Sequence, residues 1–302
     1  MARARRSLEG LSVGDAFGQR FFVEPAVAVK LIELRALPRA PWGYTDDTEM
    51  ALALYAVLDR YGRVDQDALA AEFARRWRCD PTRGYAGTAM EILEGISDGG
   101  DWRAVAGAPY GGTGSMGNGA AMRVAVLGAY FASDDPAVVA REATLSAEVT
   151  HAHKEGQAGA VAIALAAQHA WRRSRGQREG SLWEWVLART PRSETWSAIE
   201  AARAFPAEAA AHEAAEALGS GWSVIAQDTV PYCLWCAARW GDDYEEAMWN
   251  TLSGLGDRDT TCAIVGGVVA LSCVGETLPA AWVEAREGLL FEPVEKDVWR
   301  KG

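Results

Sequence analysis

The stretch Thr45–Leu58 (TDDTEMALALYAVL) carries the pattern that decides the fold. Met50, Leu54 and Leu58 stand four residues apart with further apolar residues between them, and this spacing predicts an amphipathic helix. Directly before it, threonine and acidic residues occupy the positions where a helix N-terminus favours capping oxygens and negative charge. The same spacing recurs along almost the whole chain, and the alternation typical of strands is nearly absent. We therefore predict an all-α protein.

Helical periodicity extends far beyond this first stretch. Alanine, the best helix former, is abundant, and Pro and Gly separate the periodic segments. Val27–Leu34 is the only candidate strand, and its sequence is equally compatible with a loop or a helix. No flexible linker or repeat of fixed period divides the chain, so we predict one compact domain over residues 1–302. The other segments predicted to be helical are 66–78, 119–131, 137–149, 156–172, 181–188, 198–217, 224–239, 243–255 and 260–273.

The composition excludes several classes of protein. The 302 residues are 49% apolar and 24% charged, which is ordinary for a globular protein. No apolar run approaches the roughly 18 residues that cross a bilayer. Asp15 and Arg20 interrupt the apolar part of the basic N-terminus, which argues against a signal peptide. A net charge of −11 without a basic patch argues against nucleic acid as a partner. We expect a cytoplasmic monomer that binds no membrane.

The cysteines do not form the framework of a small secreted domain, because their number is odd and they are scattered. Cys233 and Cys236 make a CxxC within a helical apolar pattern. No second pair stands at the spacing of a zinc site. We therefore predict that both are buried thiols.

A second acidic run, Asp257–Thr261 (DRDTT), precedes the periodic segment that begins at Cys262. Capping needs only one residue per helix, and adjacent carboxylates repel each other, so a shared cation is the natural neutraliser of both acidic runs. Carboxylate and hydroxyl oxygens suit Mg²⁺, Mn²⁺ or Ca²⁺. If the two helix starts face each other, their carboxylates could hold two ions roughly 3.5–4 Å apart.

Gly111–Gly119 is unusually rich in glycine for a helix connector. It contains a GxGxxG pattern, but no predicted strand precedes it, so the dinucleotide-binding interpretation fails. It also lacks the first glycine of a nucleophile elbow, which disfavours serine hydrolysis. Two interpretations remain open: a simple connector, or a loop whose amide groups bind an anion such as a diphosphate at the start of a helix.

Six short motifs carry a resemblance over most of the chain, from about Leu8 to Leu271. In sequence order they are Gly10–Gly18 (GLSVGDAFG), Tyr44–Met50 (YTDDTEM), Arg83–Gly87 (RGYAG), Gly114–Val124 (GSMGNGAAMRV), Thr150-His151 and Gly256–Gly266 (GDRDTTCAIVG). Together they resemble the ADP-ribosylglycohydrolase family, which includes the dinitrogenase-reductase-activating glycohydrolases and the ADP-ribosyl-acceptor hydrolases. The resemblance implies an all-α orthogonal helical bundle with a binuclear metal centre in a cleft.

The resemblance also implies a set of site residues. The cofactors would be two divalent cations, Mg²⁺ or else Mn²⁺, and the ligand would be ADP-ribose or an ADP-ribosylated substrate. The implied metal ligands are Thr45, Asp46, Asp47, Asp257, Asp259 and Thr260. The implied substrate contacts are Gly84, Tyr85, Gly87, Gly114, Ser115, Met116, Gly117, Asn118 and His151.

The implied activity is hydrolysis of the bond between the anomeric carbon of ADP-ribose and an acceptor. A metal-bound water, activated by Asp46 or Asp259, would attack this carbon. The acceptor, a protein side chain or a small leaving group, is not specified by the sequence. In so acidic a chain the ions, Arg123 and a helix N-terminus would supply the positive potential for the diphosphate. Trp42 is a candidate to line the cleft and stack on a base.

One position departs from the family pattern. Many members carry a glutamate seven residues after the aspartate of the GDA motif, where this chain has Phe22. Either Glu24 takes over that role, or a metal-ligating aspartate acts alone, or the protein binds ADP-ribose without cleaving it. The alternatives to the hydrolase are therefore a non-catalytic ADP-ribose-binding regulatory or immunity protein, and a hydrolase of another nucleotide-sugar or ribosyl phosphate.

Overall fold

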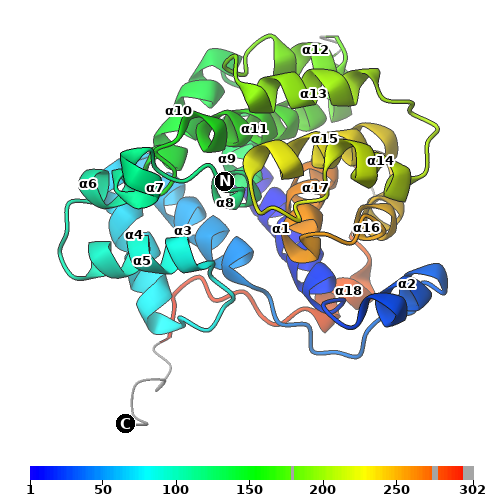
Figure 1. Ribbon diagram of the computed structural model, residues 1–302, viewed down its shortest axis with the longest axis horizontal. Helices are drawn as coiled ribbons and strands as arrows, with labels where there is room; N and C mark the ends of the chain where they lie inside the picture. Colours follow the sequence, from blue (N-terminus) through cyan, green and yellow to red (C-terminus); the bar gives the residue numbers. More distant parts are fainter. Residues whose placement is uncertain (178–179, 274–277, 295–302) are drawn as a thin grey trace.

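The computed structural model describes residues 1–177, 180–273 and 278–294, and these are almost entirely helical (Figure 1). No strand forms among them; isolated bridges pair Trp42 with Arg286 and Gly117 with Ile225. The all-α prediction is confirmed. The helices are α1 (Ala2–Gln19), α2 (Pro25–Glu33), α3 (Asp46–Tyr61), α4 (Gln66–Cys79), α5 (Gly87–Ser97), α6 (Trp102–Gly107), α7 (Pro109–Gly112), α8 (Gly119–Met122), α9 (Ala125–Tyr130), α10 (Pro136–Glu148), α11 (Lys154–Ser174), α12 (Leu182–Leu187), α13 (Glu194–Ala204), α14 (Ala211–Leu218), α15 (Ala226–Trp240), α16 (Tyr244–Leu252), α17 (Arg258–Ser272) and α18 (Ala280–Ala285).

Helices α1 and α17 lie side by side in the middle of the molecule (Figure 1). Three glycines of α1 face α17. A Cβ added at Gly14 would lie 2.2 Å from the carbonyl oxygen of Cys262, and one added at Gly18 would lie 2.3 Å from that of Arg258. Only glycine permits such an approach of two helix backbones. The contacts run antiparallel, with Gly10 against Gly266 at the other end. The C-terminal half of α1, which carries Asp15, therefore lies next to the start of α17.

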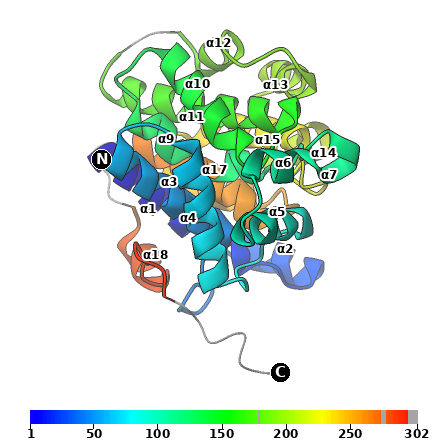
Figure 2. The same ribbon diagram turned by 90° about the vertical axis from the view of Figure 1, so that its left-hand side faces the viewer.

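Helix α11 is the second central element, and its side chains are buried along most of its length. It packs against α10, which both views show beside it (Figures 1 and 2), and against α9, α15 and α17. Alanine fills much of α11, so neighbouring helices approach closely without large side chains between them. The buried apolar residues form one continuous cluster that includes residues of α1, α11 and α17.

Three segments differ in detail from the predicted pattern. The ambiguous segment Val27–Leu34 lies mainly in a helix, α2, which Glu24 caps by accepting hydrogen bonds from the backbone of Ala26 and Val27. The predicted helix over 198–217 is broken between α13 and α14, where Pro206 removes a backbone donor. The predicted helix over 119–131 divides into the short helices α8 and α9.

Trp42 belongs to the core rather than to a cleft. It is 1% exposed, and its ring lies 5.8 Å from those of Phe17 and Trp282, measured between centroids. Its indole nitrogen donates to the carbonyl oxygen of Pro38. The prediction that Trp42 lines the cleft and stacks on a base is therefore wrong. A tryptophan beside an acidic run is equally compatible with core packing, so the sequence could not distinguish the two roles.

The cysteines are all free thiols in buried positions, which confirms the prediction for Cys233 and Cys236. Within the ranges described above, we find no helix with the length and apolar character needed to span a membrane.

Candidate active site

A pocket of about 520 Å³ opens where the starts of α3 and α17 meet the glycine-rich loop. Its acidic end is formed by the first residues of these two helices. The rest of its wall comes from α5, the loop before α8, His151 and a loop that precedes α15. The lining residues used below are Asp46, Asp47, Gly84, Gly87, Ser115, Met116, Gly117, Asn118, His151, Val224, Asp257, Asp259 and Thr260.

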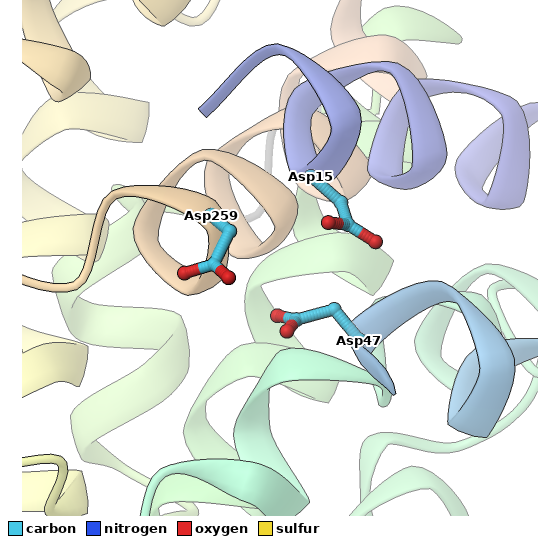
Figure 3. Close-up of side chains that lie close together, drawn as sticks. All are labelled: Asp15, Asp47 and Asp259. Atoms are coloured by element: carbon cyan, nitrogen blue, oxygen red, sulfur yellow. The ribbon is translucent and has the colours of Figure 1, made fainter. Parts of the chain in front are cut away.

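Three carboxylates, each from a different helix, cluster where the starts of α3 and α17 meet α1 (Figure 3). Asp15 comes from the C-terminal half of α1, Asp47 from the first turn of α3 and Asp259 from the first turn of α17. Each offers one oxygen, and these oxygens all lie within 4.8 Å of one another. Such a group could hold a divalent metal ion, since hard cations prefer carboxylate oxygens.

Asp15 was not among the candidate ligands derived from the sequence. It is fully buried, and its carboxylate accepts hydrogen bonds from the backbone amides and hydroxyls of Thr45 and Thr48. Burial raises its pKa to about 6, although these hydrogen bonds act in the opposite direction. The available signal was an aspartate in the middle of an otherwise apolar helical stripe, next to Gly14. Such a carboxylate has to meet partners inside the fold.

Asp47 carries an oxygen that nothing neutralises. Its Oδ2 accepts from the hydroxyls of Thr45 at 3.1 Å and Thr260 at 3.5 Å. Its Oδ1 is buried and has no hydrogen-bond partner within the described residues. Burial, and then the carboxylates of Asp15 and Asp259, raise its pKa well above the ordinary value. A buried, unsatisfied carboxylate oxygen among like charges is suited to a cation, which would satisfy the oxygen and offset the repulsion.

All four aspartates of the two acidic runs line the pocket. Burial, then the carboxylates of Asp15 and Asp257, raise the pKa of Asp46 to about 8. Asp257 accepts a hydrogen bond of 2.7 Å from the side-chain amide of Asn118. Asp259 accepts one of 2.9 Å from the backbone of Thr260, and burial raises its pKa well above the ordinary value. The donor set is therefore oxygen only.

Thr45 is the one implied metal ligand that does not line the pocket. It is the N-cap of α3, and its hydroxyl and backbone amide both donate to Asp15. The physical reason is its position one residue before the helix, which turns its hydroxyl toward the orphan donors of the first turn. Of the six implied ligands, the structure brings together Asp46, Asp47, Asp257, Asp259 and Thr260.

The glycine-rich loop reaches the pocket through Ser115, Met116, Gly117 and Asn118. Gly114 does not line it. With φ +76 it packs on the far side of the loop, where a Cβ would lie 2.6 Å from that of Ala152. The expected contact of Gly114 with substrate is therefore replaced by a backbone role, since only glycine fits this turn.

His151 lies on the pocket wall in the neutral form. Its Nδ1 is 2.7 Å from the hydroxyl of Thr150, and burial together with Arg123 lowers its pKa to about 3. Arg123 is fully buried behind the wall, donates to Gly119, Ser146 and Thr150, and has a pKa lowered to about 9 by burial. It does not line the pocket, so any positive potential that it supplies acts from behind the wall, as its effect on the pKa of Asp46 and His151 indicates.

In the RGYAG motif, Gly84 and Gly87 line the pocket and Tyr85 does not. Tyr85 is buried, and its hydroxyl has no partner within the described residues. The motif by itself does not reveal which of its residues face the pocket.

Phe22 and Glu24 also lie outside the pocket wall. Phe22 is 48% exposed, and its ring lies 5.0 Å from the guanidinium carbon of Arg258. Glu24 is engaged as the N-cap of α2. In this arrangement Glu24 does not supply a carboxylate to the acidic cluster.

The fold and this site define a helical protein with an acidic, oxygen-lined pocket, and comparisons with known proteins agree. Residues 1–301 match the family model of the ADP-ribosylglycohydrolases. The chain is 27% identical to ADP-ribosylhydrolase ARH3 of Homo sapiens over 331 residues, covering 95% of this chain and 90% of that protein. It is 28% identical to an uncharacterized protein of Archaeoglobus fulgidus, covering 93% and 90%.

A solved structure, an ADP-ribosylglycohydrolase-related protein complex, shares the fold with a TM-score of 0.66 and 24% identity, covering 96% of this chain and 94% of that one. The chain belongs to the ADP-ribosylglycohydrolase family. The expectation of an enzyme of the hydrolase class is thereby confirmed.

Proposed function

We propose that this protein is a divalent-metal-dependent hydrolase that releases ADP-ribose from an acceptor. The observation that carries the proposal is the unpartnered, buried Oδ1 of Asp47 beside the carboxylates of Asp15 and Asp259. Asp47 and Asp259 line the acidic end of a pocket whose wall also includes the glycine-rich loop, and Asp15 is buried next to them. The family and the relatives named above support ADP-ribose as the ligand.

Asp47, Asp259 and Thr260 are the proposed direct ligands, joined by Asp46 and Asp257 when two ions are bound, for which we propose Mg²⁺. Asp15, whose oxygens already accept several hydrogen bonds, would serve chiefly to hold the first turn of α3. When bound, the ions would neutralise the carboxylates and polarise oxygen atoms of the ribose and of nearby water.

The opposite end of the pocket suits the rest of ADP-ribose. Gly117 and Asn118 lie at the wall, and neutral His151 adds no positive charge that would repel a cation. Gly117 and Gly119 leave room for the His151 ring, because a Cβ on either would lie 3.2 Å from its Nε2. The apolar side chains of Met116 and Val224 complete the wall for a sugar or base.

The reaction needs one proton acceptor close to the ribose. Asp46 is the proposed base, because it lines the pocket at its acidic end, next to the proposed ligand Asp47. It takes a proton from the attacking water as the oxygen of that water bonds to the anomeric carbon. The bond between this carbon and the acceptor breaks, and the acceptor departs with the electron pair and gains a proton. The products are ADP-ribose and the free acceptor.

The test is release of ADP-ribose from a serine-linked peptide, an arginine-linked peptide and ADP-ribose-1″-phosphate, each with Mg²⁺, with Mn²⁺ and with chelator. Turnover of any of them that requires a divalent ion supports the proposal and names the acceptor. Turnover that is equal in chelator would overturn the metal requirement. Binding of ADP-ribose without turnover of any substrate would favour a non-catalytic binder.

A further inference from the structure

We infer that Glu287 and Arg83 are positioning residues that hold the acidic cluster in its working geometry from outside the pocket. Neither side chain lines the pocket. They link the C-terminal segment Ala285–Phe291, which we call the C-terminal strap, to the residues that lead into α3. The inference rests on the proposed function, because it concerns the metal-binding competence of the same cluster.

The strap pairs with the chain just before the first acidic run. The backbone amide of Trp42 donates to Ala285 at 2.6 Å, and that of Glu287 donates to Trp42 at 2.9 Å. The strap therefore runs beside Trp42–Tyr44, three residues before Asp47. A change in the strap would be transmitted directly to the start of α3.

The side chains of Glu287 and Arg83 tie this backbone down. The Glu287 carboxylate accepts from the backbone amide of Tyr44 at 2.9 Å and from the guanidinium of Arg83. Arg83 donates in turn to the carbonyl oxygen of Tyr44 at 2.9 Å, and its guanidinium carbon lies 4.1 Å from the centroid of the Tyr44 ring. Both polar groups of the Tyr44 backbone are thus held by charged, largely buried side chains.

Arg83 also sets the relation between two parts of the pocket wall. Its carbonyl oxygen accepts a 2.8 Å hydrogen bond from the amide of Asp46. The next residue, Gly84, lines the pocket with φ +93, and a Cβ there would lie 3.6 Å from Oδ1 of Asp46. Arg83 therefore fixes both the first acidic residue and the glycine that faces it.

The other end of the strap holds the first turn of α3 in a similar way. Arg76, 1% exposed, donates to Glu49 at 2.9 Å and to the carbonyl oxygens of Leu290 and Phe291. Glu49 stands in the turn that carries Asp46 and Asp47. Several carboxylates lie close together at the first turn of α3. Their mutual repulsion would push this turn apart unless such contacts restrained it.

A purely stabilising ion pair would predict a lower melting temperature and nothing else. A positioning role predicts a defect in metal binding at temperatures far below melting. Supporting groups of this kind typically change metal affinity by about 10–100-fold. The readout is therefore the binding of Mn²⁺ alone, followed by electron paramagnetic resonance, alongside kcat and KM for ADP-ribose release.

The variants are Glu287→Gln, which keeps the shape and removes the charge, and Arg83→Lys, which keeps the charge and removes the fork. Glu292→Gln is the matched control. Its side chain is 89% exposed and pairs with Arg75 at 3.5 Å, next to the strap and away from the pocket. Circular dichroism verifies that each variant is folded, and Glu287→Asp should recover part of the loss.

We expect both variants to bind Mn²⁺ about 10-fold more weakly than the parent protein, with a lower kcat and a smaller change in KM. Glu292→Gln should match the parent. Parent-like Mn²⁺ affinity and kcat in folded Glu287→Gln and Arg83→Lys would overturn the inference and leave the proposed function intact. Failure of the parent protein itself to bind Mn²⁺ would overturn the proposed metal site and this inference with it.

Discussion

The ionised carboxylate of Asp47 is strongly disfavoured by its surroundings. It is 1% exposed, one of its oxygens has no hydrogen-bond partner within the described residues, and three other aspartates of the pocket and Asp15 oppose its ionisation. Such a residue is tolerated in a fold when a cation relieves it. Its neutral isostere should therefore have opposite effects on function and on metal-free stability.

Replacing Asp47 by Asn should lower kcat/KM for ADP-ribose release by more than about 100-fold, because a direct ligand is lost. In chelator the same variant should melt at the same temperature as the parent or higher, since a buried like charge is removed. Asp259→Ala should abolish turnover with unchanged helical circular dichroism. Parent-like activity in either variant would contradict the metal assignment.

His151 makes a prediction about pH. Its folded pKa of about 3 lies below the ordinary value of 6.5, so between these values the unfolded chain binds a proton that the folded chain does not. Its contribution to stability is complete above pH 6.5 and is lost as pH falls toward 3. Between pH 7 and pH 5 the loss amounts to about 2 kcal/mol.

His151→Gln, which cannot titrate, should lose less stability than the parent over this interval in denaturant unfolding. His212→Gln, on the exposed face of α14, is the control and should follow the parent. The charged neighbour that opposes protonation of His151 is Arg123. Superimposable pH profiles of His151→Gln and the parent would show that this histidine is not held neutral by the fold.

At the level of single residues, the sequence predicted which types of side chain occur at the site better than it predicted which of them face the pocket. Five of the six implied ligands line the pocket, yet Thr45, Gly114 and Tyr85 do not, although each stands within a matching motif. A motif records which residues occur together in a loop, and only the backbone conformation decides which of them face a ligand. The left-handed φ of Gly114 illustrates this difference.

At the scale of elements, the approach of α1 to α17 assembles the site. The glycines at the crossing allow the two backbones to touch, and this brings Asp15 beside Asp259. Period and capping patterns predicted α3 and α17 well, because their acidic N-termini and apolar stripes are strong local signals. The role of Asp15 could not be predicted in the same way, because it depends on the contact between α1 and α17, which lie near opposite ends of the sequence.

Gly14→Ala should destabilise the protein by at least about 2 kcal/mol, because its Cβ would overlap a backbone oxygen of α17 that cannot rotate away. Gly107→Ala is the control. Nothing lies within 4 Å of a Cβ at this last residue of α6, so its stability should not fall. Urea unfolding of the two variants checks the comparison. Equal stability would mean that the two helices can separate without cost.

For the whole molecule, the acidic cluster is built from the first turn of α3, the first turn of α17 and the C-terminal half of α1, three segments that meet in space (Figure 3). The sequence predicted that the two acidic runs would share a cation, but their meeting in space was an inference that only the fold could provide. Breaks such as the one between α13 and α14 matter less, because neither helix contributes to the pocket.

A cation that binds the folded protein alone should stabilise all of it. With Mg²⁺ at about 100 times its dissociation constant, the gain is about 2.7 kcal/mol, which raises the melting temperature by several degrees. Sodium chloride at equal ionic strength should not reproduce the shift. Asp47→Asn combined with Asp259→Ala should lose it, and an undiminished shift in that double variant would place the ion elsewhere.

The most direct measurement is calorimetric titration of the protein with ADP-ribose, first with Mg²⁺ and then with excess chelator. We predict binding with one site per chain in Mg²⁺ and a large loss of affinity in chelator, because the acidic end of the pocket would repel the ligand without its ions. Equal affinity in both conditions, or no binding in either, would contradict the account of a metal-dependent ADP-ribose site.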